Sequence, residues 1–173
     1  ISTASIDQHT GNVILGGDDN NFINVNGDID ISGGNMDTPT GTLKITGTNV
    51  YYGGKTNASG PSGGQISATA KEMFVLDSSI VANGLKKNGG NLIVVSEDEL
   101  LSTARTNVDV SGSKKGGSVK LYGNNNNLVA GKFRADGDLS QGGNIDFSGH
   151  NVMVAAADIS AKGSNQGGKV RIG

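Results

Sequence analysis

The sequence predicts an all-β protein, a right-handed parallel β-helix (solenoid) of six to seven coils, with about 26 residues and three strands per coil. Three observations lead to this expectation: an internal repeat, strand-type alternation at fixed positions of that repeat, and a composition poor in bulky apolar residues. The 173 residues include 29 Gly, no Cys and no Trp, and only 4% are aromatic. Disordered chains share such a composition, but here the aliphatic residues recur at fixed offsets, as the thin core of a solenoid requires.

The repeat is clearest in residues 108–121, VDVSGSKKGGSVKL. There an alternating strand is followed by a polar corner, a Gly-Gly pair and a second alternating strand, and related units occupy 80–94 and 159–172. When the units are aligned on the glycine before the second strand, successive anchors are 23 to 30 residues apart. The anchors are Gly11, Gly41, Gly64, Gly90, Gly117, Gly143 and Gly168. A period of this length is typical of solenoids.

The strand after each anchor alternates between apolar and polar positions. Residues two past the anchors are all apolar: Val13, Leu43, Ile66, Leu92, Val119, Ile145 and Val170. Residues four past are apolar as well: Leu15, Ile45, Ala68, Val94, Leu121, Phe147 and Ile172. Residues one past are all polar: Asn12, Thr42, Gln65, Asn91, Ser118, Asn144 and Lys169. This period of two predicts a half-buried strand stacked on its own copies.

Two further columns and another strand complete each coil. Small residues six past the anchors predict a corner with positive φ or close backbone approach: Gly17, Gly47, Ala70, Ser96, Gly123 and Gly149. A polar column lies eight past: Asp19, Asn49, Glu72, Asp98, Asn125 and Asn151. The next strand is expected at 50–52, 73–76, 128–130 and 152–155. Residues 71–76 and 97–104 allow a helical interpretation, but their place in the repeat favours strand or corner. The usual chirality of parallel connections predicts right-handed winding.

Residues 1–173 are expected to form a single β-helical segment, an excerpt of a longer repeat protein, because the chain begins and stops inside a repeat. No signal-peptide pattern and no apolar run long enough to span a bilayer is present. The formal net charge of −2 favours neither nucleic acid nor an anionic membrane as a partner. The absence of Cys excludes disulfide frameworks and Cys-based zinc sites.

The variable corner before each anchor is the first candidate for binding, because repeat proteins often bind through such loops. Lys86 and Lys87 occupy this corner in one coil, Lys114 and Lys115 occupy it in the next, and Lys162 follows two coils on. Stacked coils would turn these lysines into a basic ridge for sulfated or acidic glycans, or for phosphate. The alternative interpretation is solvated charge that only maintains solubility.

Calcium binding and catalysis are the other candidate chemistries. Asp18-Asp19 and Glu97-Asp98-Glu99 offer oxygen ligands for Ca²⁺, but they lie three coils apart, and Asx turns and stacked Asn side chains explain the polar column without metal. We therefore expect no metal or cofactor.

A polysaccharide lyase or hydrolase would need clustered carboxylates. Asp109, Asp136 and Asp158 are expected near one corner in successive coils, with Arg134 and His150 elsewhere on the perimeter. The repeat itself explains the aspartates, and His9 and His150 are interpreted as surface residues. We therefore assign no catalytic residues and expect no enzyme activity.

Two segments carry a family resemblance: DVSG with GGSVKL at 109–121, and ISAKG with GGKVRIG at 159–173. In these units the chain resembles the filamentous haemagglutinin-type exoproteins that Gram-negative bacteria export by two-partner secretion. The resemblance implies a long β-helical shaft that is exported through an outer-membrane transporter and serves adhesion, toxin delivery or biofilm building. The NPNG-type motif of the family's secretion domain is absent, so the chain is expected to be shaft.

The leading functional hypothesis is therefore a structural and adhesive segment at the bacterial cell surface. Its partners would be glycans or proteins of a host or neighbouring cell, held by many weak contacts, with no nucleic acid and no membrane insertion. The alternative is a carbohydrate-active β-helix enzyme, a polysaccharide lyase or hydrolase. Convergence of Asp, Glu, Arg and His in one groove would favour the enzyme.

Overall fold

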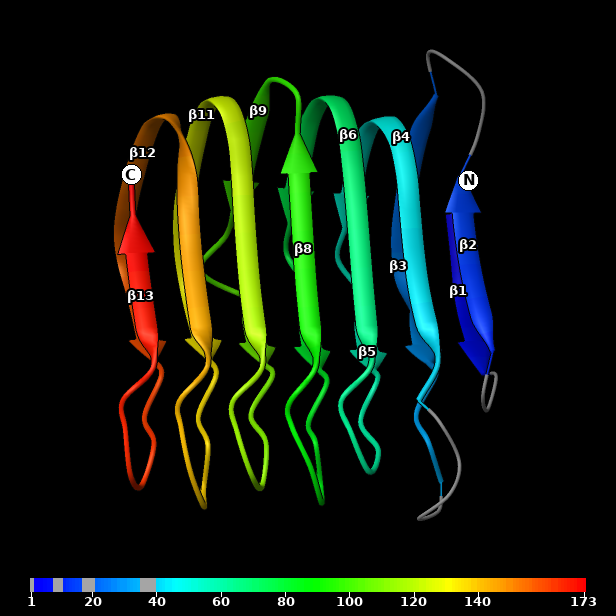
Figure 1. Ribbon diagram of the computed structural model, residues 1–173. Coiled ribbons are helices and arrows are strands. Elements are labelled where there is room, and N and C mark those ends of the chain that lie inside the picture. Colours follow the sequence, from blue (N-terminus) through cyan, green and yellow to red (C-terminus); the bar gives the residue numbers. More distant parts are fainter. Residues whose placement is uncertain (1, 8–10, 17–20, 35–39) are drawn as a thin grey trace.

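The computed structural model describes residues 2–7, 11–16, 21–34 and 40–173, and of residues 2–7 only the backbone (Figure 1). Every regular element in these ranges is a β-strand. No helix suited to crossing a bilayer occurs in them. The strands are β1 (Ser2–Asp7), β2 (Asn12–Gly16), β3 (Phe22–Asp30), β4 (Thr42–Tyr52), β5 (Lys55–Asn57), β6 (Gln65–Leu76), β7 (Ser79–Val81), β8 (Asn91–Ser96), β9 (Glu99–Ser102), β10 (Asn107–Asp109), β11 (Ser118–Arg134), β12 (Asn144–Ser160) and β13 (Lys169–Ile172).

The chain winds as a parallel β-solenoid of about six turns, with roughly 26 residues per turn. All pairing is parallel, and the strands of the inner coils pair with strands one coil before and one coil after, as β11 does with β8 and β12. In Figure 1 the front strands rise, cross the top and descend behind while the chain advances from right to left, so the winding is right-handed. The predicted fold class is confirmed.

Each coil contributes strands to three faces, which confirms the expected three strands per coil. Face 1 is the strand after each anchor: 12–16, 42–47, 65–70, 91–96, 118–123, 144–149 and 169–172. Face 2 consists of 22–25, 49–52, 73–76, 99–102, 126–129 and 151–154. Face 3 consists of 28–30, 55–57, 79–81, 107–109, 132–134 and 157–160. Residues 71–76 and 97–104, which allowed a helical interpretation, contain strand in β6 and β9.

The core is a stack of the predicted inward columns. Val119 lies in register with Leu92 on one side and with Ile145 on the other. Twelve of the fourteen residues assigned inward are buried, while Val170 and Ile172 are 46% and 52% exposed. Both belong to the final coil, which only one other coil covers. A dry aliphatic stack therefore fills the solenoid, as the alternation predicts.

Backbone contact explains the anchor glycines. A Cβ on Gly117 would clash with the carbonyl oxygen of Gly90, and one on Gly143 would clash with that of Gly117. In the small column six past the anchors, Gly123 likewise faces the carbonyl of Asn126 at close range. Glycine is therefore needed at these positions because neighbouring backbone carbonyls lie too close for a Cβ atom.

The segments before the anchors form one projecting corner, the row of loops along the lower edge of Figure 1. We define the projecting corner as residues 58–64, 82–90, 110–117, 135–143 and 161–168. An Asx turn begins it where Asp109 Oδ1 accepts the Ser111 amide at 3.0 Å, which explains the Asp-x-Ser-Gly pattern. Glycines then bridge from coil to coil, in the order Gly60, Gly84, Gly112, Gly137 and Gly163.

Candidate functional site

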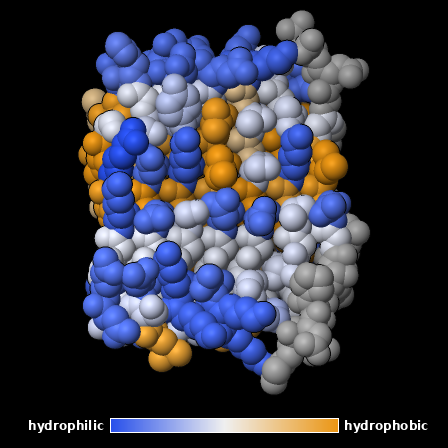
Figure 2. All heavy atoms as spheres, in the orientation of Figure 1, coloured by the Kyte–Doolittle hydropathy of each residue, from blue (hydrophilic) through white to orange (hydrophobic). Residues whose placement is uncertain are grey.

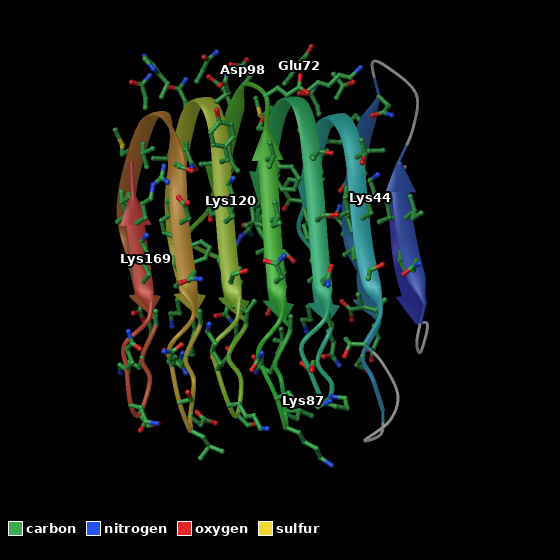
Figure 3. The ribbon with its side chains drawn as sticks, in the orientation of Figure 1. Lys44, Glu72, Lys87, Asp98, Lys120 and Lys169 are labelled. Atoms are coloured by element: carbon green, nitrogen blue, oxygen red, sulfur yellow. The ribbon has the colours of Figure 1, made fainter. Side chains whose placement is uncertain are left out.

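The predicted lysine ridge lies on the projecting corner, where Lys86, Lys87, Lys114 and Lys115 are all exposed. The backbone joins the two pairs, because the amide of Lys114 donates to the carbonyl of Lys87 at 3.0 Å. In the described part of the chain no ion pair to these four ammonium groups is found. Figure 3 shows Lys87 at the lower edge of the solenoid, directed away from it.

The ridge does not continue evenly to Lys162, since the corner between them carries Asp138 and Leu139. The Leu139 amide donates to Ser113 at 3.0 Å, and the Leu139 side chain is 69% exposed. The basic surface is therefore confined to two adjacent coils.

Stacked amides and carboxylates occupy the opposite corner, between faces 1 and 2, where Figure 3 labels Glu72 and Asp98. Asn49 donates to Glu72 at 2.9 Å, and Asn125 donates to Asp98 at 2.7 Å. In the ranges that the structure covers, no three His, Cys, Asp or Glu residues are placed to hold a metal ion; Asp18-Asp19 fall outside those ranges. Side-chain hydrogen bonds thus join these described members of the column from coil to coil.

The residues eight past the anchors are nevertheless not all paired with one another. Irregularities between Gly47 and Asn49 and between Gly123 and Asn126 shift the count by one residue. Asn49 therefore pairs with Met73 instead of Glu72. A fixed offset from the anchors loses register beyond the first strand.

A buried polar cluster, which sequence reasoning missed, joins three coils between faces 2 and 3. The Asp77 side chain is 3% exposed and accepts a hydrogen bond from Tyr51 Oη at 2.6 Å. Thr103 Oγ1 and two Arg105 guanidinium nitrogens also donate to it. Tyr51, Asp77 and Thr103 are each 26 residues apart, a spacing that could have revealed the cluster.

The pKa values in this cluster follow from its contacts. Burial alone would raise the pKa of the Asp77 carboxyl, but hydrogen bonds from Arg105, Thr103 and Tyr51 outweigh burial and hold that pKa below its ordinary value. The hydrogen bond to Asp77 is the main cause of a raised pKa for Tyr51. Because Asp77 has partners in the coil before its own and in the coil after it, it joins three coils.

On face 3, charged residues of three coils line one depression: Asn107, Asp109, Lys132, Phe133, Arg134, Asp158 and Ser160. Arg134 is in register with Asp109, and Lys132 is in register with Asp158. The expectation that Arg134 would lie elsewhere on the perimeter is therefore wrong. The register of β10 and β11 places it beside the aspartates, because both residues occupy the same outward position of face 3.

Asp136 lies at the edge of this depression, where its Oδ2 is 3.6 Å from Arg134 Nε, and His150 lies apart from it. Asp136 is held at the projecting corner by Ser160 Oγ at 2.6 Å and the Lys162 amide at 2.7 Å. His150 lies beside face 1 and face 2 depressions, and His9 is outside the described residues. Of the charged residues considered for catalysis, Asp109, Arg134 and Asp158 thus line one depression, and His150 does not.

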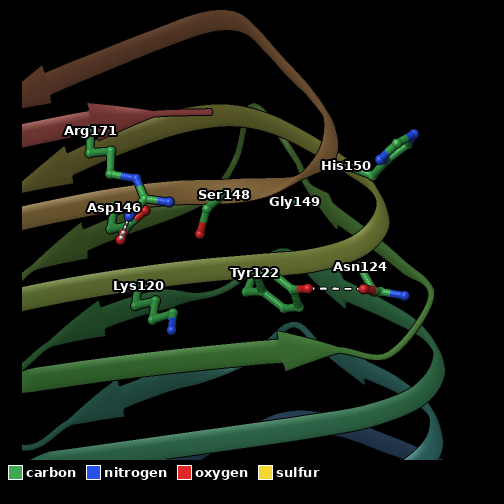
Figure 4. Close-up of a pocket in the computed structure, with 8 residues that line it drawn as sticks. All are labelled: Lys120, Tyr122, Asn124, Asp146, Ser148, Gly149, His150 and Arg171. Atoms are coloured by element: carbon green, nitrogen blue, oxygen red, sulfur yellow. Dashed lines mark hydrogen bonds and ion pairs between the residues drawn. The ribbon is translucent and has the colours of Figure 1, made fainter.

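A groove on the outer surface of face 1 spans β11, β12 and β13 (Figure 4). Its lining residues are Lys120, Tyr122, Asn124, Asp146, Ser148, Gly149, His150 and Arg171. Sequence reasoning missed this set, because the outward positions of face 1 carry different residue types in different coils. Figure 2 shows this side of the molecule, with polar residues along the upper and lower edges and a mixture of polar and apolar residues across the middle.

No protein-family model matches the chain, and neither curated proteins nor solved structures provide a match. The class that the fold defines is a right-handed parallel β-solenoid. Further assignment depends on the geometry of the surfaces described above.

Proposed function

We propose that the chain is a structural and adhesive shaft segment of a secreted bacterial surface exoprotein. The observation that carries the proposal is the lysine ridge: a backbone hydrogen bond aligns Lys87 with Lys114, while the ammonium groups of both coils are exposed. A rigid ladder thereby presents cations at a spacing of one coil, about 4.8 Å.

Attachment would come from the number of contacts rather than from one strong site. Two adjacent pairs of lysines suit a flexible anionic partner, such as a sulfated or acidic glycan or an acidic protein segment, because each exposed ion pair contributes little by itself. Several such contacts on one rigid body gain avidity without a deep pocket.

The repeat units at 109–121 and 159–173 support a placement in the filamentous haemagglutinin-type exoproteins. This placement includes an extracellular, cell-surface location and an outer-membrane transporter as the partner in secretion. It assigns no catalytic residue, metal or cofactor to this segment.

The test is retention on heparin under a salt gradient. The quadruple variant Lys86→Gln, Lys87→Gln, Lys114→Gln, Lys115→Gln should elute at distinctly lower salt than the parent protein, since exposed charge pairs are screened by salt. A charge-matched control changes four exposed lysines outside the projecting corner, Lys44, Lys55, Lys132 and Lys169, to Gln. Equal elution shifts in both variants would contradict a role for the corner.

The face 3 depression favours a second candidate, a carbohydrate-active enzyme, because Asp109 and Asp158 lie there beside Lys132 and Arg134. The assay is release of unsaturated products or reducing ends from acidic polysaccharides. Robust turnover that Asp109→Asn abolishes would replace the adhesive proposal with the enzymatic one.

A further inference from the structure

Three charges of alternating sign cross the face 1 groove. Lys120, Asp146 and Arg171 occupy the same outward position in successive coils and lie in register. Arg171 Nη1 is 3.8 Å from Asp146 Oδ2. Because paired strands are about 4.8 Å apart, the three residues form a compact row with two cations and one carboxylate.

The ring of Tyr122 lies beside this row. Tyr122 is two residues beyond Lys120, whose Nζ lies 5.8 Å from the centre of the tyrosine ring. The Tyr122 hydroxyl donates to Asn124 Oδ1 at 2.9 Å. Figure 4 shows the ring on β11, opposite Ser148 on β12.

Small residues in the next coil create the hollow next to the ring. Ser148 is in register with Tyr122, and Gly149 follows it. Any side chain at Gly149 would clash with the Gly123 carbonyl, so this part of the groove floor must stay bare. The hollow is therefore bounded by a ring, a hydroxyl and the charge row.

Asp146 contains a polar atom that the described chain does not satisfy. Its Oδ1 is buried and has no hydrogen-bond partner there, while Oδ2 faces Arg171. Buried carboxylate oxygens normally accept a hydrogen bond. The Asp146 side chain is 30% exposed, so a ligand hydroxyl would reach this carboxylate through Oδ2.

We propose that this groove binds an acidic saccharide, with one uronic acid unit beside Tyr122. The ligand carboxylate would pair with Lys120 and Arg171, because charge-assisted bonds to carboxylate are the strongest that these side chains form. Ring hydroxyls would donate to Asp146 and bond with Ser148. The apolar face of the sugar would cover the tyrosine ring, which is apolar on its faces and polar at its tip.

The chemistry of the row excludes simpler ligands. Inorganic sulfate offers Asp146 no hydroxyl and Tyr122 no apolar face, while a neutral sugar brings no carboxylate to a row that holds two cations and one carboxylate. The groove also differs from the lysine ridge, which lies on the projecting corner, so this proposal stands apart from the proposed function.

The experiment is an NMR titration of the ¹⁵N-labelled chain with hexagalacturonate, with maltohexaose and inorganic sulfate as comparison probes. Hexagalacturonate should shift the amides of residues 118–124 and 144–150 saturably, with at least tenfold higher affinity than either comparison probe. No saturable shift at millimolar ligand, equal binding of maltohexaose or sulfate, or shifts elsewhere only would overturn the proposal.

Matched substitutions locate the site. Tyr122→Val copies Val95, its counterpart in the preceding coil, and Lys120→Gln removes one cation; each should lower affinity at least tenfold. The controls Thr69→Val and Lys44→Gln change the same outward positions in distant coils and should bind like the parent. Equal losses in variants and controls would overturn the proposal. The quadruple corner variant should keep the hexagalacturonate shifts of residues 118–124 and 144–150, so failure of one proposal does not imply failure of the other.

Discussion

Two corners of the solenoid use polar residues in opposite ways. Between faces 2 and 3, the side chains themselves join the coils, because Asp77 accepts hydrogen bonds from Tyr51, Thr103 and Arg105. At the projecting corner the backbone joins the coils, as in the bond from Lys114 to Lys87, and the lysine side chains extend into solvent.

The comparison separates side chains that maintain the fold from side chains available to a partner. Changing a residue whose hydrogen bonds are internal leaves buried groups unpaired and costs stability. Changing an exposed lysine of the projecting corner should alter stability by less than about 0.5 kcal/mol. Three substitutions test this comparison: one in the hydrophobic core, one in the backbone of the projecting corner and one in the polar cluster around Asp77.

Leu121→Asp should have the largest effect. Leu121 is fully buried and stacked between Val94 and Phe147, so an aspartate there would place an unpaired charge in the aliphatic core. The expected loss is several kcal/mol, roughly 4 or more, with unfolding of the neighbouring coils. Urea denaturation followed by circular dichroism measures it.

The matched control for Leu121→Asp is Ser67→Asp, at an exposed outward position of face 1 whose neighbour in register is Lys44. Its stability should change by about 0.5 kcal/mol or less. A small effect of Leu121→Asp would contradict the inward placement of this column.

Both the core and the winding could be predicted because they depend on features that every coil repeats. The stack of Val119 on Ile145 follows from period-two alternation and a constant period. The surfaces depend instead on departures from the repeat. Arg134 meets Asp109 because both occupy outward positions whose residue type differs in each coil, and no repeat pattern contains that information.

Register shifts set a second limit on the prediction. The distance from the anchor to face 3 differs between coils. Val108 and Phe133 are in register, but they lie 18 residues past Gly90 and 16 residues past Gly117, so counting from the anchors misplaces side chains on that face. The constant spacing of Tyr51, Asp77 and Thr103 could have revealed that cluster, whereas the meeting of Asp109 and Arg134 required the pairing register, which only the folded chain provides.

Gly116→Ala should have the next largest effect, because it tests whether backbone packing maintains the projecting corner. A Cβ at Gly116 would clash with the Ala135 carbonyl of the next coil. Overpacking of this kind costs about 2–3 kcal/mol, measurable as a lower midpoint in urea. Gly167 holds the same position in the last coil, where nothing lies within 4 Å of such a Cβ. Gly167→Ala should therefore be nearly neutral, and equal losses would contradict the steric explanation.

Asp77→Asn should lower the free energy of unfolding by about 2 kcal/mol at neutral pH, since a carboxylate with several charge-assisted hydrogen bonds is replaced by a neutral amide. The pKa of Asp77 is held below that of an unfolded aspartate, about 3.9. The unfolded chain therefore binds the proton more readily, and the stability from this group is present above about pH 4 and is lost as pH falls through the lower folded pKa. Urea denaturation from pH 7 to pH 2.5 should show parent and variant converging in acid.

Tyr51→Phe removes one donor and should lose less stability than Asp77→Asn, and the quadruple corner variant should follow the parent at every pH. A constant difference between Asp77→Asn and the parent across this range would show that the cluster stabilises the corner by packing and not by charge.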